Sequence, residues 1–327
     1  MKFVELKNHL LTKNFYHCYN LFGDDSFLLD SAKNLILNYA ASKEQFDRIF
    51  ISAENFNSKN VLAILSTSSF FGGIKTVVLS GVEKTKNKEI LSFLEAYSTA
   101  PNPQAIFVVI SNEQLCETEN FKGNFLCNID CNRLDRNMIE RWVLTELGQK
   151  NATITDQALN ILLDYTNEYL SRISLELNKL VAYTSGNIKA GDVKLLVSKE
   201  LEYSVYELTE NLGNNNKQET FEILNQMMSD KKAAPYVLSL IQTYFRRMFF
   251  CAISTKTNAQ IAAELNIKEY AVKKAKETSK LFSKVALKDI VEKCNDIDQK
   301  VKSGQTSYKN AVDYLVMQIL ILNKKNQ

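Results

Sequence analysis

The sequence is poor in residues that break helices and in histidine. Only 3 prolines and 10 glycines occur among 327 residues, whereas lysine, glutamate, leucine and asparagine are abundant. This balance favours a largely helical protein. The two histidines, His9 and His17, both lie near the start of the chain, which leaves little for histidine-based catalysis.

Long apolar runs are missing as well. No run reaches the ~18 residues that a membrane-spanning helix needs, and Met1–Glu5 opens no secretory apolar segment. We therefore expect a cytoplasmic protein with no membrane partner.

Cysteine and net charge are both limited. The six cysteines stand at positions 18, 116, 127, 131, 251 and 294. Cys127 and Cys131 have no second pair and no histidine near them, so we predict reduced thiols and no metal site. The net charge of +3 gives no support to a protein that coats DNA by charge alone. The length predicts two or three domains.

Strand-like and helix-like segments alternate in the first part of the chain. Strands are expected at 16–22, 46–51, 75–79, 105–110 and 125–131, with amphipathic helices between them. Ser58 is the expected N-cap of the helix before the third strand. This alternation predicts a parallel α/β sheet over residues 1–133.

No strand is expected after Asn132. Apolar residues at helical spacing predict a small helical domain over 134–203 and a bundle of about six helices over 204–327. The predicted fold is therefore an AAA+/RecA-like α/β domain followed by two all-α domains.

A domain order of this kind would require a nucleotide-binding site. The residues that such a site needs are missing from the expected positions. The loop after the first strand, Phe22–Ser26, has one glycine, no lysine and two carboxylates, which would repel phosphate. The third strand leads to a lone Glu83, and the fourth ends in Ser111-Asn112. We predict no ATP hydrolysis, no cofactor and no catalytic residue, because positioning and charge are the whole of that catalysis.

The stretch Ser66–Gly73 carries two adjacent phenylalanines, Phe70 and Phe71, between an apolar helix and an apolar strand. Adjacent helical side chains point about 100° apart, so one narrow core stripe cannot easily hold both rings. Two interpretations stay open on this pattern. Either the rings fold back into the core, or they form an exposed plug for a partner's pocket.

Several motifs resemble those of the delta subunits of the bacterial DNA polymerase III clamp loader, and they follow one another in the same order along most of the chain. In that family a glycine and two aspartates stand where ATPases have the phosphate loop, and a serine with two apolar residues binds the clamp. Leu is common in that family where Phe70 stands here, and Gln where Ser66 stands. The segments that carry the resemblance are Tyr19–Leu29, Ser69–Leu79, Glu176–Leu180, Val205–Leu208, Ile267–Lys274 and Lys302–Gly304.

The resemblance implies a non-catalytic subunit of the DNA-directed DNA polymerase (nucleotidyltransferase) holoenzyme. It implies that Ser69, Phe70 and Phe71 bind the sliding clamp (beta subunit) and that the chain favours the opened ring. It also implies a C-terminal collar that joins gamma/tau and delta-prime type subunits around primed DNA. The exposed-plug interpretation of Phe70 and Phe71 follows from it.

Contact with primed DNA is a weaker hypothesis. Lys273, Lys276, Lys280 and Lys284 are spaced for one face of a helix, and Tyr308 could stack on a base. A solvated surface and a packing tyrosine are the alternatives. Arg246-Arg247 are expected to pair with neighbouring acidic residues rather than with DNA, and Arg172 is expected to be structural. Two other classes of function remain, an ATP-hydrolysing AAA+ clamp-loader subunit and a DNA-binding adaptor.

Overall fold

The computed structural model describes residues 1–11, 15–41, 47–68, 73–84, 88–115, 126–230, 232–267 and 269–325. Contacts within the chain divide it into two compact units, residues 1–149 and 150–327. The division into three domains, 1–133, 134–203 and 204–327, stays a prediction.

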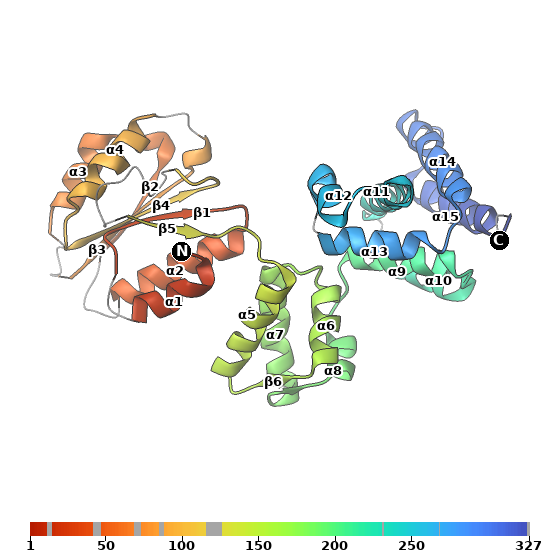
Figure 1. The fold of residues 1–327 in the computed structure, drawn as a ribbon, viewed down its shortest axis with the longest axis horizontal. Coiled ribbons are helices and arrows are strands. Elements are labelled where there is room, and N and C mark those ends of the chain that lie inside the picture. The colour runs from red at the N-terminus through yellow and green to blue at the C-terminus, as the bar shows by residue number, and fades with distance from the viewer. Residues whose placement is uncertain are drawn as a thin grey trace. The chain divides into compact units, whose positions relative to one another are not determined.

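The first unit is built on a five-stranded parallel sheet with the strand order β2-β3-β4-β1-β5 (Figure 1). In β1 and β4 the register pairs Cys18 with Phe107 and Phe22 with Ser111. The fold class expected from the sequence is thus confirmed. The strands are β1 (Cys18–Phe22), β2 (Asp47–Ser52), β3 (Lys75–Ser80), β4 (Ala105–Ser111) and β5 (Leu126–Asp130).

Helices cover both faces of this sheet, α1 and α2 on one face and α3 and α4 on the other (Figure 1). Because both faces are covered, the central strand β4 is apolar and buried along Ala105–Val109. The helices are α1 (Phe3–Leu11), α2 (Ser26–Ala41), α3 (Ser58–Ser66), α4 (Lys88–Thr99) and α5 (Arg136–Gln149), with single turns η1 (Ala53–Asn55) and η2 (Val82–Lys84).

The expected N-cap of α3 is wrong by one residue. Asn57, not Ser58, has the extended backbone of a cap, and its side chain accepts a hydrogen bond from the Asn60 amide. Asn and Ser are nearly equivalent caps, so the sequence alone could not choose between neighbours.

The second unit begins with three helices, α6 (Asp156–Tyr165), α7 (Leu170–Thr184) and α8 (Ala190–Leu196). The expected absence of strands after Asn132 is wrong. The two-residue strands β6 (Thr153–Ile154) and β7 (Asn187–Ile188) form a parallel pair. Two residues are too few to show a strand period. Thr155 is the N-cap of α6, since its Oγ1 accepts a hydrogen bond from the Ala158 amide.

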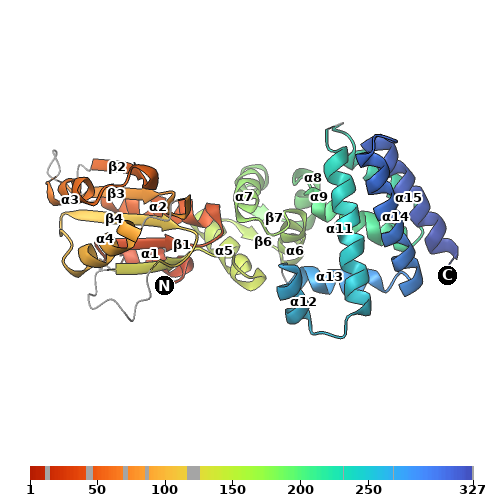
Figure 2. The same cartoon turned by 90° about the horizontal axis from the view of Figure 1, so that it is seen from above.

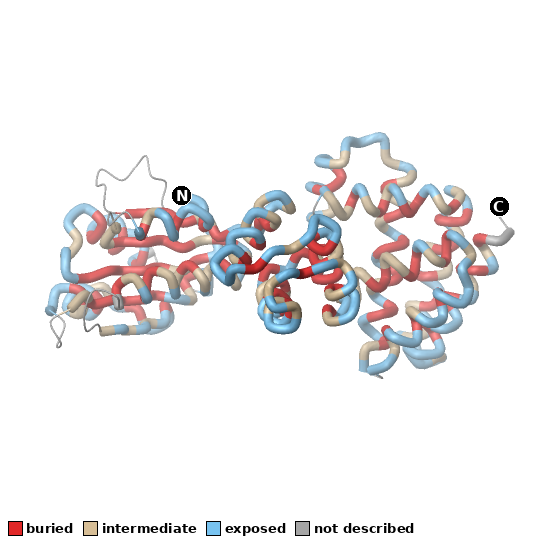
Figure 3. Tube along the Cα trace, turned by 90° about the horizontal axis from the view of Figure 1, so that it is seen from below, coloured by how far each residue is buried: buried red, intermediate tan, exposed pale blue. Residues whose placement is uncertain are grey.

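The rest of the second unit is a helical bundle around α11, which packs against α9, α13, α14 and α15. Val237, Ile241, Phe245 and Met248 are fully buried at helical spacing along α11. Buried positions recur along the helices of the bundle (Figure 3). The bundle helices are α9 (Leu201–Gly213), α10 (Lys217–Met227), α11 (Ala234–Ile253), α12 (Asn258–Leu265), α13 (Glu269–Ser279), α14 (Lys284–Lys302) and α15 (Tyr308–Lys325).

Candidate functional site

The predicted clamp-binding residues Ser69, Phe70 and Phe71 lie outside the described residues. The structure does describe both flanks of this segment. Helix α3 ends at Ser66, where Thr67 leaves the helix with an extended backbone, and β3 begins at Lys75. The choice between a plug and a core position for the two rings therefore stays a prediction.

A buried lysine joins the two flanks. The Lys75 ammonium donates to the carbonyl oxygens of Ile64 at 3.0 Å and Thr67 at 2.8 Å, and to Thr67 Oγ1 at 2.7 Å. Lys75 is 6% exposed. Its charge lies at the C-terminus of α3, where the helix dipole favours a cation and carbonyls lack helical partners. The three donors thus fix the start of β3 to the end of α3.

The approach to β4 supplies a second attachment. Asn102 Nδ2 donates to the Leu65 carbonyl at 2.7 Å, and the Lys75 amide donates to the Gln104 carbonyl at 3.0 Å. Ser68 Oγ and Gln104 Oε1 are 3.4 Å apart. The residues on both sides of 69–72 are therefore held on one frame by buried or half-buried polar groups.

The loop after β1 places carboxylates where an ATPase holds phosphate. Asp25 Oδ1 accepts the amides of Phe27 at 3.0 Å and Leu28 at 3.1 Å, so a protein carboxylate fills the N-terminus of α2. Asp24 accepts the Arg133 amide at 3.0 Å and lies 3.4 Å from the Arg133 guanidinium. A Cβ on Gly23, whose φ is +147°, would lie 2.3 Å from the Cys131 carbonyl carbon. The loop therefore packs closely against the segment that follows β5, at Cys131 and Arg133.

A cluster of two amides and a hydroxyl joins the neighbouring strands β1, β5 and β4. Asn20 Nδ2 donates to Asn128 Oδ1 at 3.0 Å, and Ser111 Oγ lies 3.2 Å from Asn20 Oδ1. All three side chains are buried. Glu83 is exposed in the turn η2. The buried cluster satisfies its own hydrogen bonds, as a structural polar network in a core must.

Arg172 is held between two carboxylates. It lies 3.4 Å from Glu176 on its own helix and 3.3 Å from Glu200, just before α9. Glu176 is buried and also pairs with Lys179 at 2.5 Å. Burial raises the pKa of Glu200, and the charge of Arg172 opposes that rise. These contacts give Arg172 the structural role expected from the sequence.

The predicted lysine face is wrong. Helix α13 ends at Ser279, so Lys280 lies in the following turn and Lys284 begins α14. Only Lys273 and Lys276 share a helix, and the Lys276 ammonium donates to the Lys256 carbonyl at 3.4 Å. Tyr308 does begin α15 and is 43% exposed. The four lysines therefore do not lie on the face of a single helix, although their spacing in the sequence predicted that they would.

A second candidate surface lies on α15, and it was not predicted from the sequence. Tyr314, Met317 and Ile321 are 46%, 52% and 48% exposed at positions i, i+3 and i+7, which form one apolar stripe. The face of α15 that packs into the bundle carries a separate set of buried apolar residues, including Val312, Leu315 and Ile319. The stripe is therefore apolar surface beyond what the bundle uses.

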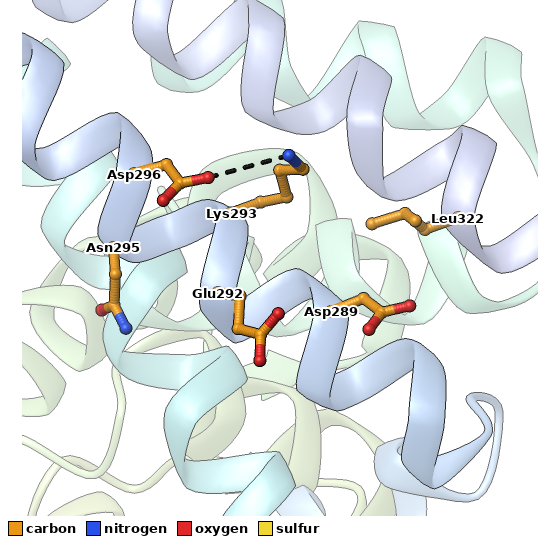
Figure 4. A pocket seen from close by; sticks show the side chains of 6 residues that line it. All are labelled: Asp289, Glu292, Lys293, Asn295, Asp296 and Leu322. Atoms are coloured by element: carbon orange, nitrogen blue, oxygen red, sulfur yellow. Dashed lines mark ion pairs between the residues drawn. The ribbon is translucent and has the colours of Figure 1, made fainter.

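Next to this helix, α14 lines a hollow of about 450 Å³ (Figure 4). Lys293 pairs with Asp296 at 3.7 Å and Lys288 pairs with Glu292 at 3.7 Å, so two of the three lining carboxylates are in ion pairs. Arg246 on α11 donates to Asn295 Oδ1 at 2.8 Å. The lining residues are Asp289, Glu292, Lys293, Asn295, Asp296 and Leu322.

Within the described ranges, no group of three or more potential metal ligands comes together. In the same part of the chain, no helix is both long and apolar enough to cross a bilayer. The described cysteines are buried and unpaired. Burial raises the pKa of Cys18 and of Cys294 to about 12, so these thiols stay protonated and unreactive at neutral pH.

Comparison with known families gives two matches. Residues 19–128 match the model described as DNA polymerase III, delta subunit. Residues 202–319 match the model described as DNA polymerase III delta subunit, C-terminal domain. Together the two models cover well over half of the chain.

Individual proteins that are similar to this chain are also described as delta subunits. The chain is 25% identical to the DNA polymerase III subunit delta of Bacillus subtilis over 328 residues, which covers 94% of each sequence. It is 22% identical to the probable DNA polymerase III subunit delta of Aquifex aeolicus, over 86% of this chain and 78% of that one. The solved Bacillus subtilis DNA clamp loader delta protein has a TM-score of 0.74 at 22% identity, covers 97% of this chain, and shares the fold.

Proposed function

This chain belongs to the family of DNA polymerase III delta subunits, and we propose that it binds the sliding clamp and favours the opened ring. The opened ring could then be placed on primed DNA during replication in the cytoplasm. Such work needs no active site in this chain. A higher affinity for the open ring than for the closed ring is sufficient, because only that difference shifts the equilibrium.

The attachment of the segment around Phe70 and Phe71 supports this proposal. Lys75 binds the end of α3 to the start of β3, and Asn102 binds the same end of α3 to the approach to β4. The segment with the two aromatic residues therefore runs between fixed points. A fixed frame lowers the entropy that a recognition segment loses on binding. Phenylalanine is also among the aromatic residues that are enriched at the cores of protein interfaces. We assign the clamp contact to Ser69, Phe70 and Phe71 on these grounds.

Replacing Lys75 by methionine is expected to lower clamp affinity and stability together. The carbonyl oxygens of Ile64 and Thr67 would lose their buried donor, which costs ~1–3 kcal/mol of unfolding free energy. Clamp affinity would fall because the two flanks lose their connection. Lys59→Met, at the exposed start of the same helix, is the matched control. Isothermal titration with the clamp and thermal melts measure both effects, and a normal affinity for Lys75→Met would contradict the positioning role.

The proposed subunit works without binding ATP. Asp25 fills the amide site at the start of α2, and Asp24 is paired with Arg133, so a triphosphate would meet two carboxylates and no lysine. We expect no saturable ATP binding by the pure chain at micromolar concentrations, measured by fluorescence with a labelled nucleotide. Tight binding would instead favour an ATP-hydrolysing clamp-loader subunit.

Partnership with gamma/tau and delta-prime type subunits is assigned to the bundle, residues 204–327. The apolar stripe of Tyr314, Met317 and Ile321 is a surface of the kind that subunit interfaces use. Lys273, Lys276, Lys280 and Tyr308 stay candidate contacts for primed DNA. A steep dependence of DNA affinity on salt for the isolated chain would favour the DNA-binding adaptor instead.

A further inference from the structure

In the second unit, helices α6–α8 lie beside the bundle α9–α15 (Figure 2). Three sets of contacts form the junction between them. The first set lies along the chain itself. The Glu200 amide donates to the Tyr165 carbonyl at 2.8 Å, and the rings of Tyr165 and Tyr203 are in tilted contact, with centroids 5.1 Å apart and an angle of 49° between their planes. The Lys199 ammonium lies 5.1 Å from the Tyr165 ring centre and 2.7 Å from Glu207. The linker is thus bonded to α6 before it and to α9 after it.

The second set connects α6 to a helix more than a hundred residues away. The Tyr270 hydroxyl on α13 donates to Asp164 Oδ1 at 2.9 Å, and the Lys274 ammonium lies 3.8 Å from Asp164 Oδ2. The same ammonium lies 4.4 Å from the ring centre of Tyr206 on α9. Asp164 and Lys274 are 19% and 25% exposed, so solvent screens this pair less than a surface pair.

The third set comes from another helix. Arg172 on α7 reaches Glu200 at 3.3 Å, and Glu176 keeps the guanidinium in place at 3.4 Å. The junction therefore has separate attachments on α6 and α7, and they end on α13 and on the residue just before α9.

We propose that this junction is a lock, through which α6–α8 and the bundle move as one rigid body. A pivot in the linker between α8 and α9 would have to break the Asp164 contacts, the Arg172 contact or both, because they lie on different helices. The linker is itself fixed by the Glu200 amide and by Lys199. Residues 197–200 are then a brace between the two helical groups.

The consequence for clamp loading rests on the proposed function. A displacement that partner subunits impose on the bundle would reach α6–α8 undiminished. The rigidity itself is a property of the isolated chain, so it can be tested without any clamp or partner. Its failure would leave clamp binding untouched.

The test is a distance measurement on the full chain by pulsed electron paramagnetic resonance. Spin labels at Leu195→Cys on α8 and Val285→Cys on α14 report across the junction, since both positions are well exposed. Val285→Cys with Met317→Cys gives a reference pair inside the bundle. Cys116 is changed to Ser in every variant, because the other five cysteines are buried. We expect the cross-junction distribution to be as narrow as that of the reference pair.

The double variant Asp164→Ala with Arg172→Ala removes both side attachments and should broaden only the cross-junction distribution. Asp298→Ala with Lys288→Ala, an equal change of charge on the surface of α14, should leave it narrow. A broad distribution in the chain that retains Asp164 and Arg172 would overturn the proposal even if the double variant failed to fold. A narrow distribution in the folded double variant would overturn it as well.

Discussion

Replacing Phe70 and Phe71 by alanine is expected to abolish measurable clamp binding and to leave the melting temperature nearly unchanged. If the rings fill a clamp pocket, each truncation removes an aromatic anchor worth ~2 kcal/mol or more, close to a thirtyfold loss of affinity. Assembly with the other loader subunits should continue, because we assign that contact to residues 204–327. Titration of the variant with the cognate clamp measures the loss.

Two controls separate the plug from a core position. Phe50→Ala removes a ring that is 63% exposed on β2 in the same unit, and it should change neither affinity nor stability. Phe107→Ala removes a ring that is 1% exposed and should cost ~3–5 kcal/mol of unfolding free energy. If Phe70→Ala with Phe71→Ala behaved like the Phe107 variant in a thermal melt, the rings would belong to the core.

Placing glutamates on the apolar stripe of α15 should remove the chain from the loader. Met317→Glu with Ile321→Glu puts two carboxylates into the proposed interface on the exposed face of α15. Interface centres are depleted of charge, and a buried unpaired charge costs several kcal/mol. We expect the variant to fold normally, because both side chains are about half exposed, and to bind the clamp normally.

Size-exclusion chromatography with the cognate loader subunits checks this expectation. Leu175→Glu is the matched control, a leucine on α7 that is 64% exposed. It should assemble as the unchanged chain does. Full incorporation of the α15 variant would place the interface elsewhere on the bundle.

The sheet and most helices could be predicted because their signals are long and periodic. The apolar run at Ala105–Val109 indicated a buried strand, and β4 is indeed the central strand with helices on both faces. The two-residue strands β6 and β7 gave no period to detect. Four lysines at helical spacing predicted one helix face, but α13 ends at Ser279. The spacing of residues does not show where a helix ends, so this boundary could not be predicted.

The candidate site was only partly predictable. Ser69, Phe70 and Phe71 were found from a local motif, whereas Lys75 and Asn102 act through contacts 8 to 37 residues away in the sequence. A lysine at the start of a strand is ordinarily a surface residue. Its role as the donor for the end of α3 follows only from packing. The same holds for the stripe on α15, since an exposed and a buried apolar residue look alike in the sequence.

The central claim is that this chain favours the opened clamp, and one comparison of affinities tests it most directly. The full-length chain is titrated into the cognate clamp and into the same clamp with its ring interfaces covalently cross-linked shut. The account predicts clearly weaker binding to the locked ring, because the chain can shift the ring only by its difference in affinity for the two forms. Equal affinity for both rings would contradict it.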